Sequence, residues 1–385
     1  MNPRLTVLLA GLLLSACGDD VAAIAFSLRA AEAGAPRLLA AILLAQALPA
    51  VALGLFGGVL ADRSLRWWWW PASLLVQGGL FLLMAVTASD PVVVACVAGA
   101  SAVSAVTGPV GNKLVAQHSQ DHARTGGHLA TVNGLSQACG AALGGIAFGV
   151  NGIAPLLCAN AATFTVLALA ALAVTRRAPV VLDPSPQRGV LLGFRRLAQP
   201  GAFGPAGLLL LVWTVFATSV EGVVGVFVLT GPAQWSPAAV GSAWGLWGAG
   251  VVVGGQLAGR SRGHRTTLLV CGAATMGTVF LVLALALPGF GPGAALFLVG
   301  GAANGAFNAA VSRTLLTALP LTEQARGWAA YRWTVTCCLL AGYAVGGAFG
   351  AQHAVLALAA AGALAVAGAV VRVLLPTAAP RGVPS

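Results

Sequence analysis

Charge is the property that this sequence lacks most. Only 8% of its 385 residues are Asp, Glu, Lys or Arg, whereas 58% are hydrophobic. A soluble chain of this length needs a polar surface to cover its core, so the composition excludes an ordinary globular protein. Apolar runs of about 20 residues recur along the whole chain, which is typical of transmembrane helices. The sequence therefore predicts an all-α membrane protein.

The motifs of several other protein classes are also missing. The seven cysteines include no CxxC pair, so we expect neither a disulfide framework nor a cysteine metal site. No glycine-rich phosphate loop precedes the single Lys113, and no nucleophile–base constellation is visible, so we predict neither an ATP-driven pump nor an enzyme. His118 and His122 have the spacing of a helical metal pair, but a polar loop is the simpler interpretation. We expect no metal and no cofactor.

The basic residues indicate how the chain is oriented. The formal net charge is +11, but the Lys and Arg residues form short clusters between apolar runs, so nucleic acid is not an expected partner. Twelve spans are predicted, at residues 5–28, 37–59, 69–88, 92–112, 128–150, 153–174, 204–230, 238–258, 267–288, 292–312, 328–349 and 353–375. With the N-terminus inside, only Arg29 and Arg37 lie on the outer side. The positive-inside rule then predicts a multi-pass protein of a bacterial inner (plasma) membrane with both termini cytoplasmic.

The first apolar run has an alternative interpretation as a lipoprotein signal. Leu14-Ser15-Ala16-Cys17 is similar to a lipobox. A lipidated cysteine is followed by a polar tether, whereas here apolar sequence resumes at once with Val21. Removal of this run would also leave an odd number of spans. We therefore expect residues 5–28 to remain as the first helix.

The two halves of the chain repeat. Residues 57–64 recur as 254–261, residues 121–124 as 323–326, and residues 140–145 as 342–347, in the same order and about 200 positions apart. Two parallel six-helix repeats around a central cavity form a transporter architecture. We predict an N-terminal six-helix bundle at residues 1–177, a cytoplasmic linker at 178–202 and a C-terminal six-helix bundle at 203–385.

One segment of the first repeat carries a family resemblance. Gly58-x-Leu60-Ala61-Asp62-Arg63-x-x-Arg66 resembles the loop 2–3 motif of the major facilitator superfamily (MFS). Gly18-Asp19-Asp20, Leu48-Pro49 and the glycine-rich fifth span are similar to bacterial twelve-span exporters of the macrolide- and siderophore-efflux type. The resemblance covers essentially the whole chain. It implies the MFS fold, with twelve transmembrane helices in two pseudo-symmetric six-helix bundles.

The resemblance also implies a gate of charged residues on the inner side. The members of this predicted gating motif are Gly58, Asp62, Arg63, Arg66, Asp121, Arg124, Glu323 and Arg326. Their carboxylates would hold the outward-open state closed at the cytoplasmic face. The alternative is a set of solvated loop charges that serves only topology, and we favour gating for Asp62 and topology for most of the arginines. Leu65 replaces the usual glycine, and Gly259 replaces Asp62 in the second copy, so such a gate would be asymmetric.

Three carboxyl groups lie within predicted spans, Asp19 and Asp20 in the first and Glu221 in the seventh. A charged side chain at membrane depth costs about 2.5–3.5 kcal/mol on insertion scales, so it normally faces a cavity or a partner. The resemblance implies that these two spans line the central cavity. The alternative is a structural role, since successive helix positions point about 100° apart and one aspartate must face away. Asn304 and Asn308 in the tenth span would either bind substrate or bridge helices.

The predicted function is secondary active transport by alternating access. Exchange of a proton for a cationic substrate at one carboxylate would give proton-coupled efflux of amphipathic or cationic small molecules, such as a drug or natural product. The alternatives are an uptake permease for a small metabolite, or a non-transporting scaffold or sensor of the same fold. Ala141 replaces the proline expected in the fifth span, and the fourth span lacks an embedded arginine, so direction and coupling ion stay open. We expect a monomer in a lipid bilayer.

Overall fold

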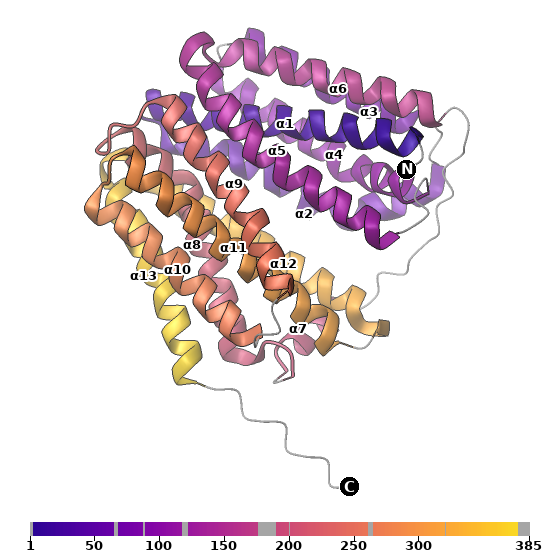
Figure 1. Ribbon diagram of the computed structural model, residues 1–385. Helices are drawn as coiled ribbons and strands as arrows, with labels where there is room; N and C mark the ends of the chain where they lie inside the picture. The colour runs from indigo at the N-terminus through magenta and orange to yellow at the C-terminus, as the bar shows by residue number, and fades with distance from the viewer. Residues whose placement is uncertain are drawn as a thin grey trace, which may run out of the picture. The chain divides into compact units, whose positions relative to one another are not determined.

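The computed structural model is helical throughout the part of the chain that it describes, namely residues 3–64, 68–87, 89–117, 122–175, 190–199, 201–260, 265–319 and 321–375. Figure 1 shows the helices in chain order. The long helices are α1 (Pro3–Glu32), α2 (Pro36–Ser64), α3 (Trp69–Val86), α4 (Asp90–Gln117), α5 (His122–Asn151), α6 (Ile153–Thr175), α8 (Gly204–Thr230), α9 (Pro237–Arg260), α10 (Arg265–Ala286), α11 (Phe290–Ala318), α12 (Leu321–Ala348) and α13 (Ala354–Leu374). The short elements are α7 (Val190–Leu197) and η1 (Ala351–His353).

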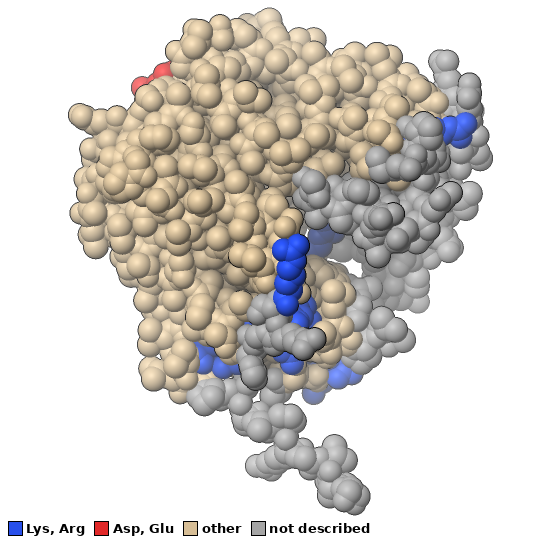
Figure 2. Space-filling view, viewed as in Figure 1, with Lys and Arg blue, Asp and Glu red and all other residues tan. Residues whose placement is uncertain are grey.

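Each of the twelve predicted spans coincides with one long helix, which confirms the all-α fold class. Within the described residues, ten helices are long and apolar enough to cross a membrane. The other two, α5 and α12, are of similar length but richer in glycine and polar residues. Large areas of the face in Figure 2 carry no charged side chain, as expected for a surface in contact with lipid.

Two compact units make up the chain. The first comprises Met1–Ser185 with Gln234–Gly248, and the second comprises Pro186–Ala233 with Ala249–Ser385. In the first unit α1 packs on α5 and α6, and α3 packs on α4 and α6. In the second unit α8 packs on α12 and α13, and α10 packs on α11 and α13. The sequence repeat therefore has a counterpart in the way that each unit packs its helices.

The first helix is continuous through the lipobox-like segment. Leu8 and Leu9, which precede Cys17, are buried in core clusters of the first unit. Ala22 and Phe26, which follow it, are buried in another core cluster of the same unit. Both parts of α1 are thus packed into the bundle.

Close contacts at glycines show which residues of the two repeats are equivalent. A Cβ atom at Gly140 of α5 would lie 2.7 Å from the Asp20 Cβ atom of α1. In the second unit, a Cβ atom at Gly342 of α12 would contact the Ser219 Cβ atom of α8. Asp20 and Ser219 therefore occupy equivalent positions, 199 residues apart.

The same correspondence holds one helical turn further on. A Cβ atom at Gly144 would lie 3.0 Å from the carbonyl oxygen of Val21. A Cβ atom at Gly346 would lie 3.3 Å from the carbonyl oxygen of Val220. Val21 and Val220 are again 199 residues apart. The α1–α5 contact and the α8–α12 contact are thus two copies of one helix packing, in which glycines allow the backbones to approach closely.

Candidate functional site

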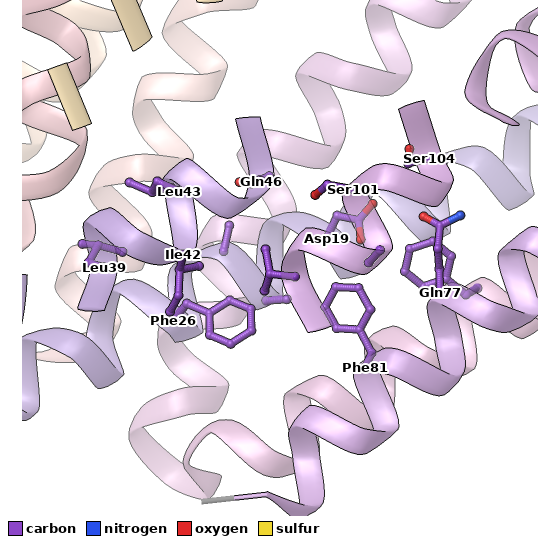
Figure 3. Close-up of a pocket in the computed structure, with 15 residues that line it drawn as sticks. Asp19, Phe26, Leu39, Ile42, Leu43, Gln46, Gln77, Phe81, Ser101 and Ser104 are labelled. Atoms are coloured by element: carbon purple, nitrogen blue, oxygen red, sulfur yellow. The ribbon is translucent and has the colours of Figure 1, made fainter. Parts of the chain in front are cut away.

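A cavity of about 150 Å³ lies inside the first unit, between α1, α2, α3, α4 and α6. Figure 3 shows its lining. The residues that line it are Asp19, Ala22, Ala23, Phe26, Leu39, Ile42, Leu43, Gln46, Gln77, Phe81, Val97, Ala100, Ser101, Ser104 and Phe164. Five helices thus contribute to one small site, and Asp19 is the one ionisable side chain among the lining residues that the structure describes.

The lining is divided into a polar and an apolar side. Asp19, Ser101, Ser104 and Gln77 lie on one side in Figure 3, whereas Phe26 and the aliphatic side chains of α2 lie on the other. The ring of Phe81 lies beside Asp19 in this view. The cavity can therefore accommodate a molecule with one polar and one apolar end.

Asp19 is oriented by a buried asparagine of α6. The Asn160 side chain is 0% exposed, and its Nδ2 atom donates a hydrogen bond of 3.0 Å to Asp19 Oδ1. Thr163 Oγ1 lies 2.7 Å from the backbone oxygen of Asn160 and 3.1 Å from Asn160 Oδ1, so its single hydroxyl proton is shared between the two oxygens. Gly18 leaves room for this pair, since a Cβ atom there would contact Asn160 Oδ1 and lie 2.6 Å from Thr163 Oγ1. The Asp19 carboxyl, which is exposed on its cavity side, is thus held in one orientation.

Asp20 faces a different way from its neighbour. Its side chain lies against α5, beside Gly140 and near Ser136, whose hydroxyl donates to the backbone oxygen of Asn133 at 3.0 Å. Ser136 is itself buried, at 3% exposure. The two aspartates are therefore separated, as the 100° rotation per helical residue requires. Asp19 faces the cavity and Asp20 faces a helix contact.

Glu221 is buried within the second unit, at 5% exposure. Its Oε1 atom lies over Gly225, where a Cβ atom would be only 2.7 Å away, so this glycine leaves space for the carboxyl. Tyr343 of α12 interacts with it electrostatically. By the register of the α1–α5 and α8–α12 contacts, Glu221 is equivalent to Ala22, one turn beyond Asp19, rather than to either aspartate.

The two asparagines of α11 hydrogen-bond to each other. Asn308 Nδ2 donates to Asn304 Oδ1 at 2.9 Å, one turn away on the same helix. Asn308 is exposed and Asn304 is partly exposed. This contact satisfies part of their hydrogen-bonding capacity along one helix instead of bridging two helices.

The side chains of the predicted gating motif lie outside the described residues. This holds for Gly58, Asp62, Arg63, Arg66, Asp121, Arg124, Glu323 and Arg326. Within the described part, no group of three or more His, Cys, Asp or Glu residues could hold a metal ion.

Sequence reasoning missed most of the cavity lining. It did not single out the lining residues Gln77, Ser101 and Ser104, or Asn160, which orients Asp19 from outside the lining, although each is a polar residue inside an apolar span. That signal is weak, because a Ser or Thr within a helix is commonly satisfied by its own backbone. Ser73 and Thr107 illustrate this, since each of their hydroxyls contacts a carbonyl oxygen of its own helix, at 2.7 and 2.8 Å.

Comparisons with known proteins agree with this architecture. The sequence profile of the Major Facilitator Superfamily matches residues 8–300. A comparison with curated protein sequences gives no match. The fold is similar to that of the nucleoside transporter NupG, with a TM-score of 0.73 and 14% identity over 96% of this chain and 99% of that one. A bacterial homologue of the iron transporter ferroportin gives a TM-score of 0.72 and 15% identity, over 96% and 98%.

A third similar structure is a POT family transporter in complex with 5-aminolevulinic acid, with a TM-score of 0.72 and 9% identity over 97% of this chain and 96% of that one. Identities this low establish the shared fold and carry no substrate from one chain to the other. The profile match spans most of the chain, and the two packed repeats have the matching architecture. The chain therefore belongs to the major facilitator superfamily.

Proposed function

We propose that this transporter exports amphipathic or cationic small organic molecules in exchange for protons. The observation that carries the proposal is the Asp19 carboxyl, which is fixed by Asn160 and faces a cavity with no Lys, Arg or His among its described lining residues. A carboxylate at membrane depth without a cationic partner in its cavity is costly. It is neutralised either by a proton or by a cationic ligand.

Competition for this carboxyl gives a coupling scheme. A cationic substrate binds Asp19 as the carboxylate, and a proton that arrives from the outer side displaces it there. The protonated carboxyl then returns to the inner-facing state and releases its proton to the cytoplasm. Each cycle moves one cation outward and one proton inward, while the two bundles rock about the site.

The other carboxyls have separate roles in this proposal. Glu221 is 5% exposed, so its carboxyl can be protonated but is hardly accessible to a substrate. Asp20, which lies against α5 beside Gly140, belongs to the α1–α5 contact. Asn304 and Asn308 supply polar groups to the transport pathway of the second bundle, and the gating motif around Asp62 closes the inner face.

The proposed topology places both termini in the cytoplasm of a bacterium, in a monomer with bundles at residues 1–177 and 203–385 joined by a linker. One contact supports the order of the first spans. Arg29 near the end of α1 and Asp90 at the start of α4 form a salt bridge of 3.2 Å, as expected if these two ends lie on the same side of the membrane.

The test measures retention of a fluorescent lipophilic cation in pump-deficient bacteria that express the chain. Wild-type cells should retain less dye than empty-vector cells, and a protonophore or Asp19→Asn should abolish the difference. Glu32→Gln is the matched control, because it removes an exposed carboxylate from the outer end of the same helix. Glu221→Gln should also abolish export if that carboxyl carries a proton.

Membrane levels of all variants are matched before retention is compared. Equal retention in wild-type and Asp19→Asn cells would contradict the proposed role of Asp19. Higher dye accumulation in wild-type cells than in empty-vector cells would instead support uptake.

A further inference from the structure

We infer that the cavity of the first unit binds a primary ammonium group attached to a single aromatic ring, that is, an arylalkylammonium ion. The inference deepens the proposed function and rests on it for the transport step, whereas the binding step is independent. It follows from the charge, the hydrogen-bonding groups, the aromatic side chains and the size of the cavity.

The charge of the cavity favours a cation. Among the described residues that line it, Asp19 is the one ionisable side chain and none is basic. Asp19 Oδ1 already accepts a hydrogen bond from Asn160, which leaves Oδ2 for a ligand. A neutral ligand would leave the carboxylate unpaired, and an anion would be repelled by it.

The hydrogen-bonding groups favour a primary ammonium in particular. Such a group has three N–H donors and needs three acceptors. Gln77 Nε2 donates to Ser73 O at 3.3 Å, so its Oε1 atom is the part of the amide that can accept. Ser101 and Ser104 add hydroxyl oxygens on the same side of the cavity as Asp19 and Gln77 (Figure 3). A quaternary ammonium could not use these acceptors.

Aromatic side chains line the cavity both beside Asp19 and on the apolar side, and they favour a ring in the ligand. Phe81 and Phe164 are stacked, with ring centroids 5.5 Å apart and an angle of 25° between their planes. Phe26, at 5% exposure, lines the apolar side together with Ile42. A ligand ring that packs among these side chains gains offset or edge-to-face contacts, and Phe81 can also stabilise the nearby cation.

The volume limits the ligand to one ring. Small-molecule sites usually measure about 300–1,000 Å³, so a cavity of about 150 Å³ is smaller than that range. Apolar cavities of this size in other proteins hold one benzene molecule. A multi-ring cation would leave most of its surface outside the cavity.

The test is direct binding to the purified full chain in lipid nanodiscs, by calorimetry. The probes are phenethylammonium, 2-phenylethanol, the trimethylated phenethylammonium ion and tetraphenylphosphonium. We expect phenethylammonium to bind about ten- to a hundredfold more tightly than the alcohol, because a charge-assisted hydrogen bond is lost with the ammonium. The other two cations should bind more weakly than phenethylammonium.

The control variants assign the preference to the cavity. Asp19→Asn should reduce the preference for phenethylammonium over the alcohol to within about threefold, whereas Glu32→Gln should retain it. The wild-type comparison alone keeps the inference testable if Asp19→Asn does not fold. Equal affinity for phenethylammonium and the alcohol, or tighter binding of either bulky cation, would overturn the inference.

The binding test and the transport test can fail independently of each other. If the dye assay shows export that depends on Asp19 but phenethylammonium does not bind, the proposed function stands and the ligand class is wrong. If phenethylammonium binds with the expected preference but cells that express the chain do not export labelled phenethylammonium, the ligand class stands and the proposed direction of transport is wrong.

Discussion

The substitution Gly18→Ala tests the geometry that orients Asp19. Its added methyl group would contact Asn160 Oδ1 and lie 2.6 Å from Thr163 Oγ1, and neither partner can remain in place. Overpacking of this kind costs about 1–3 kcal/mol. Displacement of Asn160 also removes its hydrogen bond to the Asp19 carboxyl, which is worth about 1.5–3 kcal/mol for a charged acceptor.

One effect opposes these losses. Replacing glycine by alanine inside a helix stabilises the helix by about 1 kcal/mol. The expected net effect of Gly18→Ala is therefore a destabilisation of about 1.5–5 kcal/mol. The measurement is thermal or denaturant unfolding of the purified protein in detergent, with Gly79→Ala as the control, because a Cβ atom at Gly79 has no neighbour within 4 Å.

A multiple variant makes the prediction sharper, because the sign of the effect should reverse. Asn160→Ala together with Thr163→Ala removes both side chains that a methyl group at Gly18 would meet. Adding Gly18→Ala to that background should then stabilise the protein, by up to about 1 kcal/mol, since the clashes with the amide and with the hydroxyl are both gone. Our account of the site would be refuted if Gly18→Ala were as stable as the wild type, or if it destabilised both backgrounds equally.

Two further predictions concern stability. Gly277→Ala should be less stable than the control Gly79→Ala by about 1–3 kcal/mol, because its methyl group would lie 2.6 Å from the backbone oxygen of Gly362; a melting temperature equal to that of Gly79→Ala would contradict this contact. Arg29→Gln should cost less than about 1 kcal/mol, because its pair with Asp90 is solvent-accessible, with side chains 26% and 51% exposed. Unfolding at low and high salt measures this term, and a larger loss would mean that the pair is shielded from solvent.

The helices could be predicted because apolar runs and their breaks are explicit in the sequence. Their ends were less accurate. The span predicted at 92–112 is part of α4, which continues to Gln117, and the span predicted at 292–312 is part of α11, which continues to Ala318. A helix can extend past its apolar run into polar sequence, because its backbone hydrogen bonds do not depend on the membrane. Hydropathy therefore locates the span rather than the helix.

The cavity could be predicted only in part. Asp19 was identifiable because a carboxyl is rare in an apolar run, but its partner Asn160 is 141 positions away. That pairing depends on the packing of α1 against α6, which no local pattern encodes. The cavity lining also depends on which face each helix turns inward, and an all-round apolar helix gives little periodic signal for this.

The repeat register shows a further limit of sequence comparison. The matched segments place Asp20 and Glu221 about one repeat apart, whereas the helix contacts make Ser219 the equivalent of Asp20. The α1–α8 pair is displaced by 199 residues and the α5–α12 pair, at Gly140 and Gly342, by 202. Connections of different length between equivalent helices shift the numbering, so a single offset cannot align the functional positions of both repeats.

The carboxyl groups of the two units occupy similar positions on their helices but have different surroundings. Glu221 is equivalent to Ala22, and three residues separate Ala22 from Asp19, so the two carboxyl positions lie within about 60° of one helix face and one turn apart. Their surroundings differ, because Asp19 is exposed to a cavity whereas Glu221 is 5% exposed over Gly225. A carboxyl that binds and releases an organic cation must be exposed to a cavity. A carboxyl that exchanges only a proton can function when it is buried. The asymmetry of the two repeats therefore supports the proposal that the first unit binds the substrate and the second contributes a proton site.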